Sequence, residues 1–355
     1  MIGVAILGAG IGAQHLAAYR ALPAQFAVRT ICDLDLDRAR AMVGPDNGIR
    51  LTDKLAEVYA DPSVELVDIC LPPHLHAEVA IAALKAGKHV ICEKPLATSL
   101  KDADRIAAAA DRAASWVFPV FQYRFGHGIR ALKALMEAGL TGAALSADLE
   151  THWDRRADYY CVPWRGSWAT EGGGAVLIHA IHIHDLMTHL LGPVAEVSAM
   201  LTTRANPIET EDCGAIAFRL VSGAVATSSV TLGAAGDHSR LRIAFERLTA
   251  QSDTLPYDPG GGRWSFAARS AEDQALVEAC LADLPEAPGG FEGFLQGVAG
   301  CLKDGAPPPV SLVDGRRSIE LVSAIYEANR RGRVTQLPIG RRRVSYRGWM
   351  PLEKV

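Results

Sequence analysis

Glu93, Lys94 and Pro95 form the first group whose residue types and spacing are suited to chemistry. They follow residues 88–92, a short run with the pattern of a buried strand. Because open α/β sheets bind their ligands at the carboxyl ends of strands, Lys94 is expected at such a site. A lysine there can accept a proton from a hydroxyl group or stabilise a developing alkoxide. The alternative is a plain surface ion pair between Glu93 and Lys94.

A second group, His179, His182 and Asp185, lies in a helical pattern that follows three consecutive glycines. Residues three apart on a helix share one face, whereas His184 points elsewhere. A histidine in this position can act as acid or base near neutral pH. No metal is predicted along the stripe that His189 would extend, since such a site needs ligands from other elements and none is evident.

A glycine turn near the start of the chain indicates a dinucleotide site. Residues 2–7 are apolar, and Gly8, Gly10 and Ala13 follow with the spacing G-x-G-x-x-A before a helical pattern. Gly8 permits the tight turn, Gly10 lets the backbone approach a pyrophosphate, and Ala13 allows close packing of helix on strand. Amide groups at the helix start hold the phosphates. The cofactor-binding residues predicted here are Gly8, Gly10, Ile11, Gly12 and Ala13.

Asp33 ends a second apolar run, at residues 26–32. A carboxylate in this place accepts hydrogen bonds from the adenosine ribose and repels the 2′-phosphate of NADP. NAD is therefore the predicted cofactor, and NADP is kept as the alternative. The competing interpretation is that Asp33 only caps the helix beginning near Asp35 or Asp37.

The elements that position these residues alternate between strand and helix. The order is strand 65–71, helix 77–86, strand 88–92, helix 99–114 and strand 116–121. This alternation predicts a parallel, doubly wound sheet of the Rossmann type. The turn between the strand 65–71 and the helix 77–86 should line the nicotinamide half of the site, with Leu71, Pro72 and His76. For His76, helix capping is the alternative to a place in the wall of the site.

These motifs together resemble the Gfo/Idh/MocA family, the relatives of glucose-fructose oxidoreductase and inositol dehydrogenase. The likeness is carried by residues 8–15, Asp33, residues 72–76 and residues 86–97. The resemblance implies that Lys94 contacts the substrate hydroxyl and the nicotinamide ribose and takes part in proton transfer. It also implies a cis peptide bond before Pro95, and it adds Glu93, Lys94 and Pro95 to the cofactor site.

The pattern changes at residue 122, where we place a domain boundary. Residues 1–122 are predicted to bind the dinucleotide, and residues 123–355 to form an α+β domain for substrate binding and oligomerisation. Its alternating segments predict a large, mostly antiparallel sheet with one face covered. They lie at residues 146–153, 196–203, 213–220, 224–232 and 241–246. The resemblance implies an open sheet whose outer face forms the contact of a homodimer or homotetramer.

The stretch around His182 resembles the family's GGG…H-x-x-D segment. The resemblance implies that His182 approaches the substrate hydroxyl as acid or base, while Asp185 either orients the histidine or packs the helix. Relatives often carry Asp or Asn four residues before the histidine, but Ile178 stands there in this sequence. The missing acid puts in doubt an inositol substrate and an Asp-assisted histidine. His179 is a candidate replacement, with a packed or solvated histidine as the alternative.

Aromatic and arginine side chains of the second domain are candidates for substrate binding. Their faces and guanidinium forks suit polyhydroxylated rings or an attached anionic group, although any single aromatic can instead be a core or loop anchor. The candidates are Tyr123, Arg124, Trp153, Tyr159, Tyr160, Trp164 and Arg165, together with His179 and Asp185.

Composition narrows the class of protein. The 355 residues suit about two domains, and 49% hydrophobic with 21% charged residues is ordinary for a folded chain. A net charge of -4 argues against a nucleic-acid partner. No apolar stretch reaches the roughly 18 residues of a membrane span. The seven cysteines are scattered without metal or redox spacing, which favours a reducing compartment, the cytoplasm.

The sequence therefore predicts a cytoplasmic NAD-dependent oxidoreductase that moves hydride between nicotinamide and a hydroxyl-bearing carbon of a sugar, polyol or sugar derivative. Lys94 and His182 are predicted to carry the proton chemistry. One alternative is an enzyme whose tightly bound NAD is recycled during elimination, epimerisation or glycosidic cleavage. Another is a dinucleotide-binding regulatory protein without catalysis.

Overall fold

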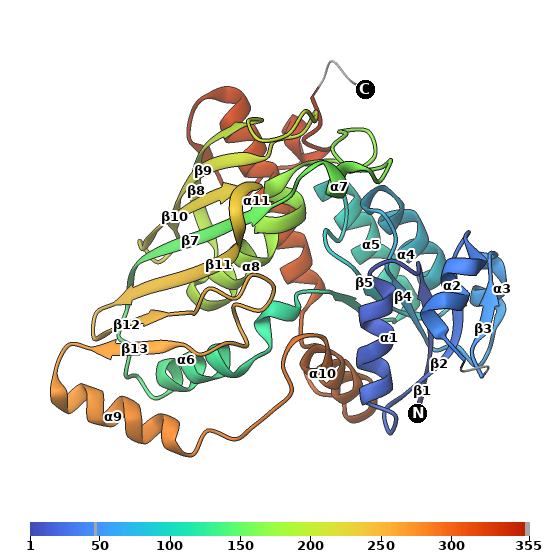
Figure 1. Ribbon diagram of the computed structural model, residues 1–355, viewed down its shortest axis with the longest axis horizontal. Helices are drawn as coiled ribbons and strands as arrows, with labels where there is room; N and C mark the ends of the chain where they lie inside the picture. The colour runs from blue at the N-terminus through green and yellow to red at the C-terminus, as the bar shows by residue number, and fades with distance from the viewer. Residues whose placement is uncertain (46–47, 352–355) are drawn as a thin grey trace. The chain divides into compact units, whose positions relative to one another are not determined.

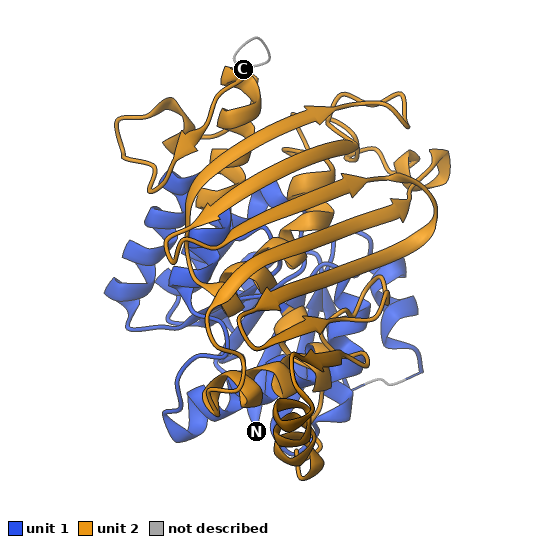
Figure 2. Cartoon of the chain, turned by 90° about the vertical axis from the view of Figure 1, so that its left-hand side faces the viewer, with its two compact units in different colours: residues 1–121, 291–319 blue, residues 122–290, 320–355 orange. Residues whose placement is uncertain are grey.

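The computed structural model describes residues 1–45 and 48–351, and the chain divides into two compact units (Figure 2). The first unit contains residues 1–121 and 291–319, and the second contains residues 122–290 and those from 320 onward. The division after Phe121 lies one residue before the boundary that the sequence predicts.

The segment 291–319, placed in the second domain from sequence, packs with the first unit. Its Phe291 ring lies 4.5 Å from the ring of His15, and Arg316 Nε donates to Asp104 Oδ1 at 2.7 Å. These contacts join residues more than 200 positions apart, which no local sequence pattern reveals.

A six-stranded parallel sheet forms the centre of the first unit, in the order β3-β2-β1-β4-β5-β6 within the described residues (Figure 1). Its strands are β1 (Ile2–Leu7), β2 (Phe26–Cys32), β3 (Arg50–Thr52), β4 (Leu66–Ile69), β5 (His89–Cys92) and β6 (Val117–Pro119). The order reverses between β1 and β4, and ligands of such sheets bind at the carboxyl ends beside this point. The doubly wound fold predicted from the sequence is confirmed.

The helices of the first unit follow the predicted alternation. They are α1 (Gly12–Ala21), α2 (Leu36–Val43), α3 (Leu55–Ala60), α4 (His76–Lys85), α5 (Leu100–Ala113) and α10 (Gly290–Asp304), with the 3-10 turn η1 (Pro73–Leu75) before α4. The residues of β1 from Val4 to Leu7 have no exposed surface. Parallel strands covered on both faces need such continuous apolar runs, which explains why these strands were visible in the sequence.

An eight-stranded sheet dominates the second unit, in the order β13-β12-β11-β7-β10-β9-β8-β14 within the described residues (Figure 2). The strands are β7 (Ala144–Asp154), β8 (Val194–Thr202), β9 (Cys213–Leu220), β10 (Val225–Thr231), β11 (Gly233–Phe245), β12 (Leu248–Gln251), β13 (Ser265–Ala268) and β14 (Thr335–Gln336). Only the central pair β7 and β10 is parallel among these strand pairs. The predicted, mostly antiparallel sheet is confirmed, with β12 to β14 as short additional strands.

Helix α8 (Ile181–Leu191) lies on the buried face of this sheet. Its His184 Nε2 is 2.9 Å from Ser228 Oγ of β10, and its residues from Ile181 to Thr188 are all buried. The helix ends before Gly192, whose φ of 88° and following proline give the stop that the sequence predicts. The remaining helical segments are η2 (Gln122–Arg124), α6 (His127–Glu137), α7 (Ala157–Tyr160), α9 (Ala271–Ala282) and η4 (Val344–Tyr346), and α11 (Leu312–Arg331) runs from the first unit into the second.

Among the helices of the described residues, none combines the length and the apolar composition that crossing a membrane requires.

Candidate functional site

The glycine turn between β1 and α1 has the geometry of a phosphate cradle. Gly8 has a φ of 102°, and a Cβ atom on it would lie 2.4 Å from the carbonyl oxygen of Cys70. Within the described residues, no heavy atom comes within 4 Å of the position that a Cβ on Gly10 would take. The turn is therefore closed towards the sheet and open on its outer side, where a pyrophosphate can approach the helix amides. These features fit a dinucleotide.

Close packing of α1 on the sheet occurs at Gly12, not at Ala13. A Cβ on Gly12 would lie 3.0 Å from Ile6 Cγ2, whereas Ala13 is exposed. The packing role predicted for Ala13 is therefore wrong. Since α1 begins at Gly12, the next residue is rotated by about 100° away from the sheet.

Asp33 ties the end of β2 to the glycine turn. Its Oδ2 accepts a 2.6 Å hydrogen bond from the Ala9 amide, and its Oδ1 accepts hydrogen bonds from the Asp35 amide and from Arg38 Nη2. Burial alone would raise the pKa of Asp33, but these donors lower it, so the carboxylate is charged at neutral pH. The cap of α2 is Asp35, which accepts from the amides of Asp37 and Arg38. The interpretation of Asp33 as the helix cap is wrong.

Lys94 follows β5 at the carboxyl edge of the sheet. The bond between Lys94 and Pro95 is cis, as the family resemblance implies. Lys94 is half-buried, and its backbone amide donates to Glu93 Oε2 at 3.0 Å. The other carboxylate oxygen, Oε1, lies 3.1 Å from His15 Nε2. Because Glu93 is only 6% exposed, the interpretation of Glu93 and Lys94 as a surface ion pair is wrong.

His76 braces the two loops predicted to hold the cofactor. Its Nδ1 lies 2.7 Å from the carbonyl oxygen of Pro95, and its Nε2 lies 2.7 Å from that of Leu71. Complete burial lowers the pKa of His76, despite these two carbonyls. In the described structure α4 begins after Leu75 without a side-chain cap, so the capping role considered for His76 is wrong. Pro72 and Leu71 lie in the loop that His76 anchors.

In the second unit, η2 and α8 bring Tyr123 and His182 together. The two rings stack with centroids 4.4 Å apart and planes inclined by 23°. The Tyr123 hydroxyl donates to the Pro256 carbonyl at 3.2 Å, and burial raises the pKa of this phenol strongly. Tyr123 therefore offers its ring face to His182 and stays a neutral phenol.

The same two elements are fastened by Arg124 and Asp185. Arg124 Nε donates to Asp185 Oδ2 at 2.7 Å, and Nη2 donates to Oδ1 at 2.6 Å. Both side chains are almost fully buried, with 4% and 2% exposed. The guanidinium fork predicted to face substrate is thus bound to a carboxylate of the protein. Of the two roles considered for Asp185, this geometry favours packing of the helix.

A π-helical turn, η3 (Val176–Ala180), precedes α8 and carries His179. Such a turn holds one more residue than an α turn, and these turns often lie at functional sites. His179 Nε2 lies 3.2 Å from the Tyr159 hydroxyl, and its ring meets the Trp153 ring edge-on at 5.0 Å. His179 therefore belongs to an aromatic cluster beside the stripe of His182 and Asp185.

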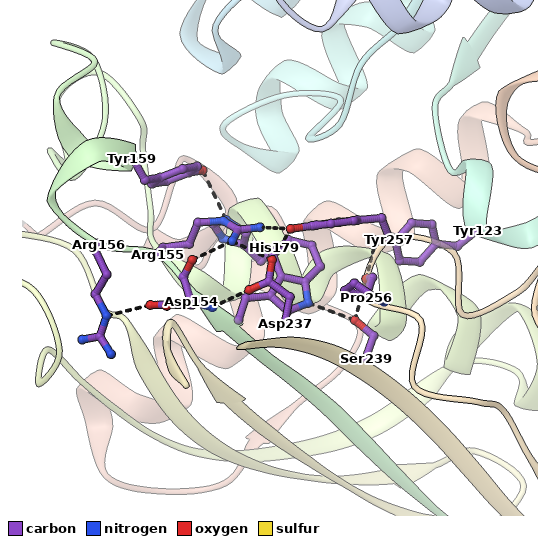
Figure 3. Close-up of polar contacts among 11 residues, drawn as sticks. Tyr123, Asp154, Arg155, Arg156, Tyr159, His179, Asp237, Ser239, Pro256 and Tyr257 are labelled. Carbon is purple, nitrogen blue, oxygen red and sulfur yellow. Dashed lines mark hydrogen bonds and ion pairs between the residues drawn. The ribbon is translucent and has the colours of Figure 1, made fainter. Parts of the chain in front are cut away.

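Three further residues of this cluster, Arg155, Asp237 and Tyr257, were not among the predicted candidates (Figure 3). Arg155 Nη1 donates to Asp237 Oδ2 at 2.9 Å, and Nη2 donates to the Tyr257 hydroxyl at 2.7 Å. The Arg155 guanidinium also lies 4.9 Å from the ring centroid of Trp153. These residues come from the loop directly after β7, from β11 and from the loop after β12, so no sequence spacing connects them.

Hydrogen bonds connect this cluster to Tyr123, and we call the cluster of Trp153, Arg155, His179, Asp237 and Tyr257 the aromatic wall. Trp153 Nε1 donates to Ser239 Oγ at 3.1 Å, and Ser239 Oγ donates to the Pro256 carbonyl at 2.8 Å. The same carbonyl accepts from Tyr123, as Figure 3 shows. A continuous chain of ring contacts and hydrogen bonds therefore runs from His182 through Trp153 to Arg155.

The predicted candidates Tyr160, Trp164 and Arg165 lie at the far side of Tyr159. The Arg165 guanidinium sits 3.8 Å from the Tyr159 ring centroid and 4.5 Å from that of Trp164. Burial lowers the pKa of Arg165. The Glu171 carboxylate, whose Oε1 lies 3.7 Å from Arg165 Nη1, opposes this effect in part. Arg165 and Tyr160 also line a cavity of about 620 Å³ together with Ala157, Gly166, Ser167 and residues 206–209.

Each guanidinium near the wall faces a carboxylate. Arg155 pairs with Asp237, Arg165 lies near Glu171, and Arg156 Nε donates to Asp154 Oδ1 at 2.6 Å. The local charges balance, which suits hydroxyl groups better than a bound anion.

Comparisons with known proteins agree with both units. A model described as an oxidoreductase family with an NAD-binding Rossmann fold matches residues 2–121. A model of the GFO/IDH/MocA C-terminal domain matches residues 129–251. Together the two models cover more than half of the chain.

Similar curated proteins include two dehydrogenases. Levoglucosan dehydrogenase of Pseudarthrobacter phenanthrenivorans is 32% identical over 62% of this chain and 59% of its own length. Myo-inositol 2-dehydrogenase of Thermotoga maritima is 26% identical over 82% of this chain and 85% of its own length. The first three curated relatives are matched over only 58–59% of their lengths.

A solved structure matches nearly the whole chain. The WlbA dehydrogenase from Bordetella pertussis, in complex with NADH and UDP-GlcNAcA, is 28% identical with a TM-score of 0.83. The match covers 96% of this chain and 99% of that protein.

Proposed function

Since this chain belongs to the GFO/IDH/MocA family of oxidoreductases, we propose that it transfers hydride between nicotinamide and a hydroxyl-bearing carbon of a sugar, polyol or sugar derivative. The observation that carries the proposal is Lys94, half-buried at the carboxyl edge of the sheet that also forms the glycine cradle. Two curated relatives are dehydrogenases of levoglucosan and myo-inositol, and a similar structure holds NADH with a sugar nucleotide.

The cofactor proposed is NAD. The amides after Gly8 and Gly10 would hold its pyrophosphate, and the charged Asp33 would accept from the adenosine ribose and repel a 2′-phosphate. When bound, the nicotinamide supplies the hydride acceptor or donor. The cofactor residues predicted around it are Leu71, Pro72, His76, Glu93, Lys94 and Pro95, of which His76 and Glu93 hold the two loops by hydrogen bonds.

Lys94 and His182 are the proposed proton-transfer residues. A neutral Lys94 amine can take the hydroxyl proton as the carbon is oxidised, and the ammonium form can stabilise a developing alkoxide. His182 is held by its stacking on Tyr123, and an imidazole can act as a proton donor or acceptor. We assign Asp185 to holding α8 in place, because its carboxylate binds Arg124 through both oxygens.

The wall from Trp153 to Arg155 is the proposed platform for the substrate ring. Aromatic faces pack against the C–H groups of a sugar, and the fixed pair of Arg155 and Asp237 offers a donor and an acceptor for hydroxyls. The balanced charges of this wall favour a neutral sugar or polyol over a sugar acid.

The outer face of the eight-stranded sheet is proposed to contact a second copy, in a homodimer or homotetramer. Met200 of β8 and Val225 of β10 are 74% and 46% exposed on strands whose other faces are buried. A cavity of about 610 Å³ lies on the same sheet, lined by residues of β7 to β12. Light scattering on the purified protein tests this by its molar mass; a monomer would contradict it.

A cytoplasmic location is also proposed. All seven cysteines lie in the described residues and are free thiols, which suits a reducing compartment.

The test of the activity is a panel of neutral sugars, polyols and sugar acids, each assayed with NAD and with NADP. We expect the absorbance of reduced nicotinamide to rise with NAD and at least one neutral substrate. Purified protein that carries bound cofactor but reduces no added NAD would contradict net dehydrogenation and favour internal redox chemistry.

A further inference from the structure

Helix α1 carries a buried histidine that reaches the loop of Lys94. His15 is 1% exposed, and its Nδ1 lies 2.8 Å from Asp68 Oδ2 of β4. Its Nε2 lies 3.1 Å from Glu93 Oε1, and the other oxygen of Glu93 accepts from the Lys94 amide. One imidazole thus links the helix after the glycine turn with the backbone of the proposed catalytic lysine.

The two carboxylates at the ring favour the charged form of His15. A neutral imidazole has one N–H donor, whereas an imidazolium has two. Carboxylate oxygens stand at both ring nitrogens, so only the imidazolium donates to both. Burial alone would lower the pKa of His15, but the Asp68 carboxylate raises it well above its ordinary value.

The other groups around the ring support an ion network. Tyr19 donates its hydroxyl to Asp68 Oδ2 at 2.9 Å, and the Phe291 ring of α10 packs 4.5 Å from the imidazole. Cys70 Sγ lies 3.6 Å from Asp68 Oδ1, and burial raises the pKa of this thiol to about 12. Although His15, Asp68 and Cys70 are close enough to chelate a metal, the thiol and the imidazolium would each first have to lose a proton to bind one.

The charges of this network bear on Lys94. A protonated His15 places one positive charge between the carboxylates of Asp68 and Glu93, and Lys94 follows Glu93 directly. Without the imidazolium, two buried carboxylates would face each other with one donor fewer apiece. Glu93 would then lose a contact that holds its side chain, and the acceptor of the Lys94 amide would be held less firmly.

We propose that His15, as an imidazolium, is a positioning residue that holds Glu93 and thereby sets the place and the proton affinity of Lys94. The inference rests on the proposed role of Lys94 in proton transfer. It assigns to the first helix, beyond phosphate binding, the task of aligning the proton-transfer group with the cofactor site.

The first test measures the charge of His15 without any substrate. We expect the side-chain nitrogen resonances of His15, in a nitrogen-15 NMR titration of the intact chain, to report two protonated ring nitrogens at pH 7. A neutral ring at pH 7 would overturn the proposal.

The second test measures Lys94 in His15→Gln. Gln has similar reach but no charge, so the surroundings of Lys94 become more negative and hold its proton more tightly. We expect the pH curve for labelling of Lys94 by an amine-reactive anhydride, read by mass spectrometry, to move to higher pH. The control is Tyr19→Phe, which removes a hydrogen bond to Asp68 but keeps the imidazolium. The positioning role would be overturned if both variants had a lower melting temperature but an unchanged pH curve for the labelling of Lys94.

The third test is kinetic. We expect turnover of His15→Gln to fall about tenfold or more, while NADH affinity measured by fluorescence changes less than about twofold, since small displacements of a catalytic group are costly. The double variant of His15→Gln and Glu93→Gln should have nearly the same turnover as Glu93→Gln alone, because both substitutions break the same contact. Independent, multiplying losses would contradict the proposal. The NMR and labelling tests need no substrate, so failure of every sugar would overturn the proposed function and leave this inference to be judged separately.

Discussion

Arg124 grips Asp185 through two hydrogen bonds of 2.7 and 2.6 Å, and this buried pair fastens η2 to α8. The two elements carry Tyr123 and His182, whose rings stack. The position of the proposed acid–base histidine therefore depends on an ion pair that does not itself take part in proton transfer.

Asp185→Asn should destabilise the protein by about 3–5 kcal/mol, because it leaves a buried guanidinium without its counter-ion. Thermal or denaturant unfolding measures the change. The control is Asp37→Asn, which breaks an exposed pair with Arg40 and should have little effect. Equal stabilities of the Asp185 variant and the wild type would contradict the structural role.

Asp33→Ser should shift cofactor preference towards NADP. The substitution removes the charge that repels a 2′-phosphate and frees Arg38, whose side chain is 56% exposed, to bind one. We expect the ratio of kcat/KM for NADP to that for NAD to rise about tenfold or more. Asp35→Ser is the control, since it keeps a capping side chain and leaves Asp33 in place. An unchanged ratio in Asp33→Ser would rule out this basis of selectivity.

Lys94→Ala and His182→Ala should each lower turnover by about two orders of magnitude or more and leave dinucleotide binding nearly intact. Steady-state kinetics and NADH fluorescence measure the two effects. His184→Gln is a matched control on the same helix, because His184 faces Ser228 and the sheet. Near-normal turnover in both alanine variants would refute the assignment.

Arg155→Gln should raise the KM for a neutral sugar more than it lowers kcat, since the proposed contact is to hydroxyls away from the reacting carbon. The neighbouring Arg156→Gln serves as control, because Arg156 is 55% exposed and its bonds to Asp154 and to the Gly233 carbonyl lie at the surface. Comparable kinetics of the two variants would remove Arg155 from the proposed platform.

Glu211 should make stability depend on pH. Its carboxylate accepts from the amide of Gly174, the amide of Val176 and the hydroxyl of Tyr326, at the start of the segment that leads to His182. Burial raises the pKa of Glu211 to about 7, so the folded state binds a proton more tightly than the unfolded state. This contribution is complete below about pH 4.5 and is lost as the pH rises through 7.

The comparison that isolates this effect is the melting temperature of the wild type and Glu211→Gln between pH 5 and 8. The difference between the two proteins should change over this range, with the wild type losing relative stability as the pH rises. Parallel curves would show that Glu211 does not titrate near neutral pH.

Much of the first unit was predictable because its signals are local. Strand β2 has the predicted bounds 26–32, and the glycine turn joins β1 to α1 where expected. The residue of α1 that packs on the sheet was harder to predict. The helix begins at Gly12, one residue before Ala13, and this start decides which residue faces the sheet. The short strands β12 to β14 lacked a long alternating pattern and escaped prediction.

The second unit shows what local patterns miss. From the sequence Arg124 is a candidate substrate ligand, but in the structure it binds Asp185. Arg155 is not a candidate from the sequence, because its partner Asp237 lies 82 positions away. A side chain's chemical role depends on the group that meets it in space. The spacing of residues along a helix or strand does not supply that information across a fold.

The sequence alone determined the Rossmann sheet, the cradle at Gly8 and the place of Lys94 at a strand end, because apolar runs and glycine turns act through neighbouring residues. The tertiary structure decided which charged side chains pair with one another. His15 meets Asp68 and Glu93 across 53 and 78 residues, and packing excludes the water that would otherwise separate them. Only the folded chain could therefore bring a histidine of the first helix to Glu93, the neighbour of Lys94.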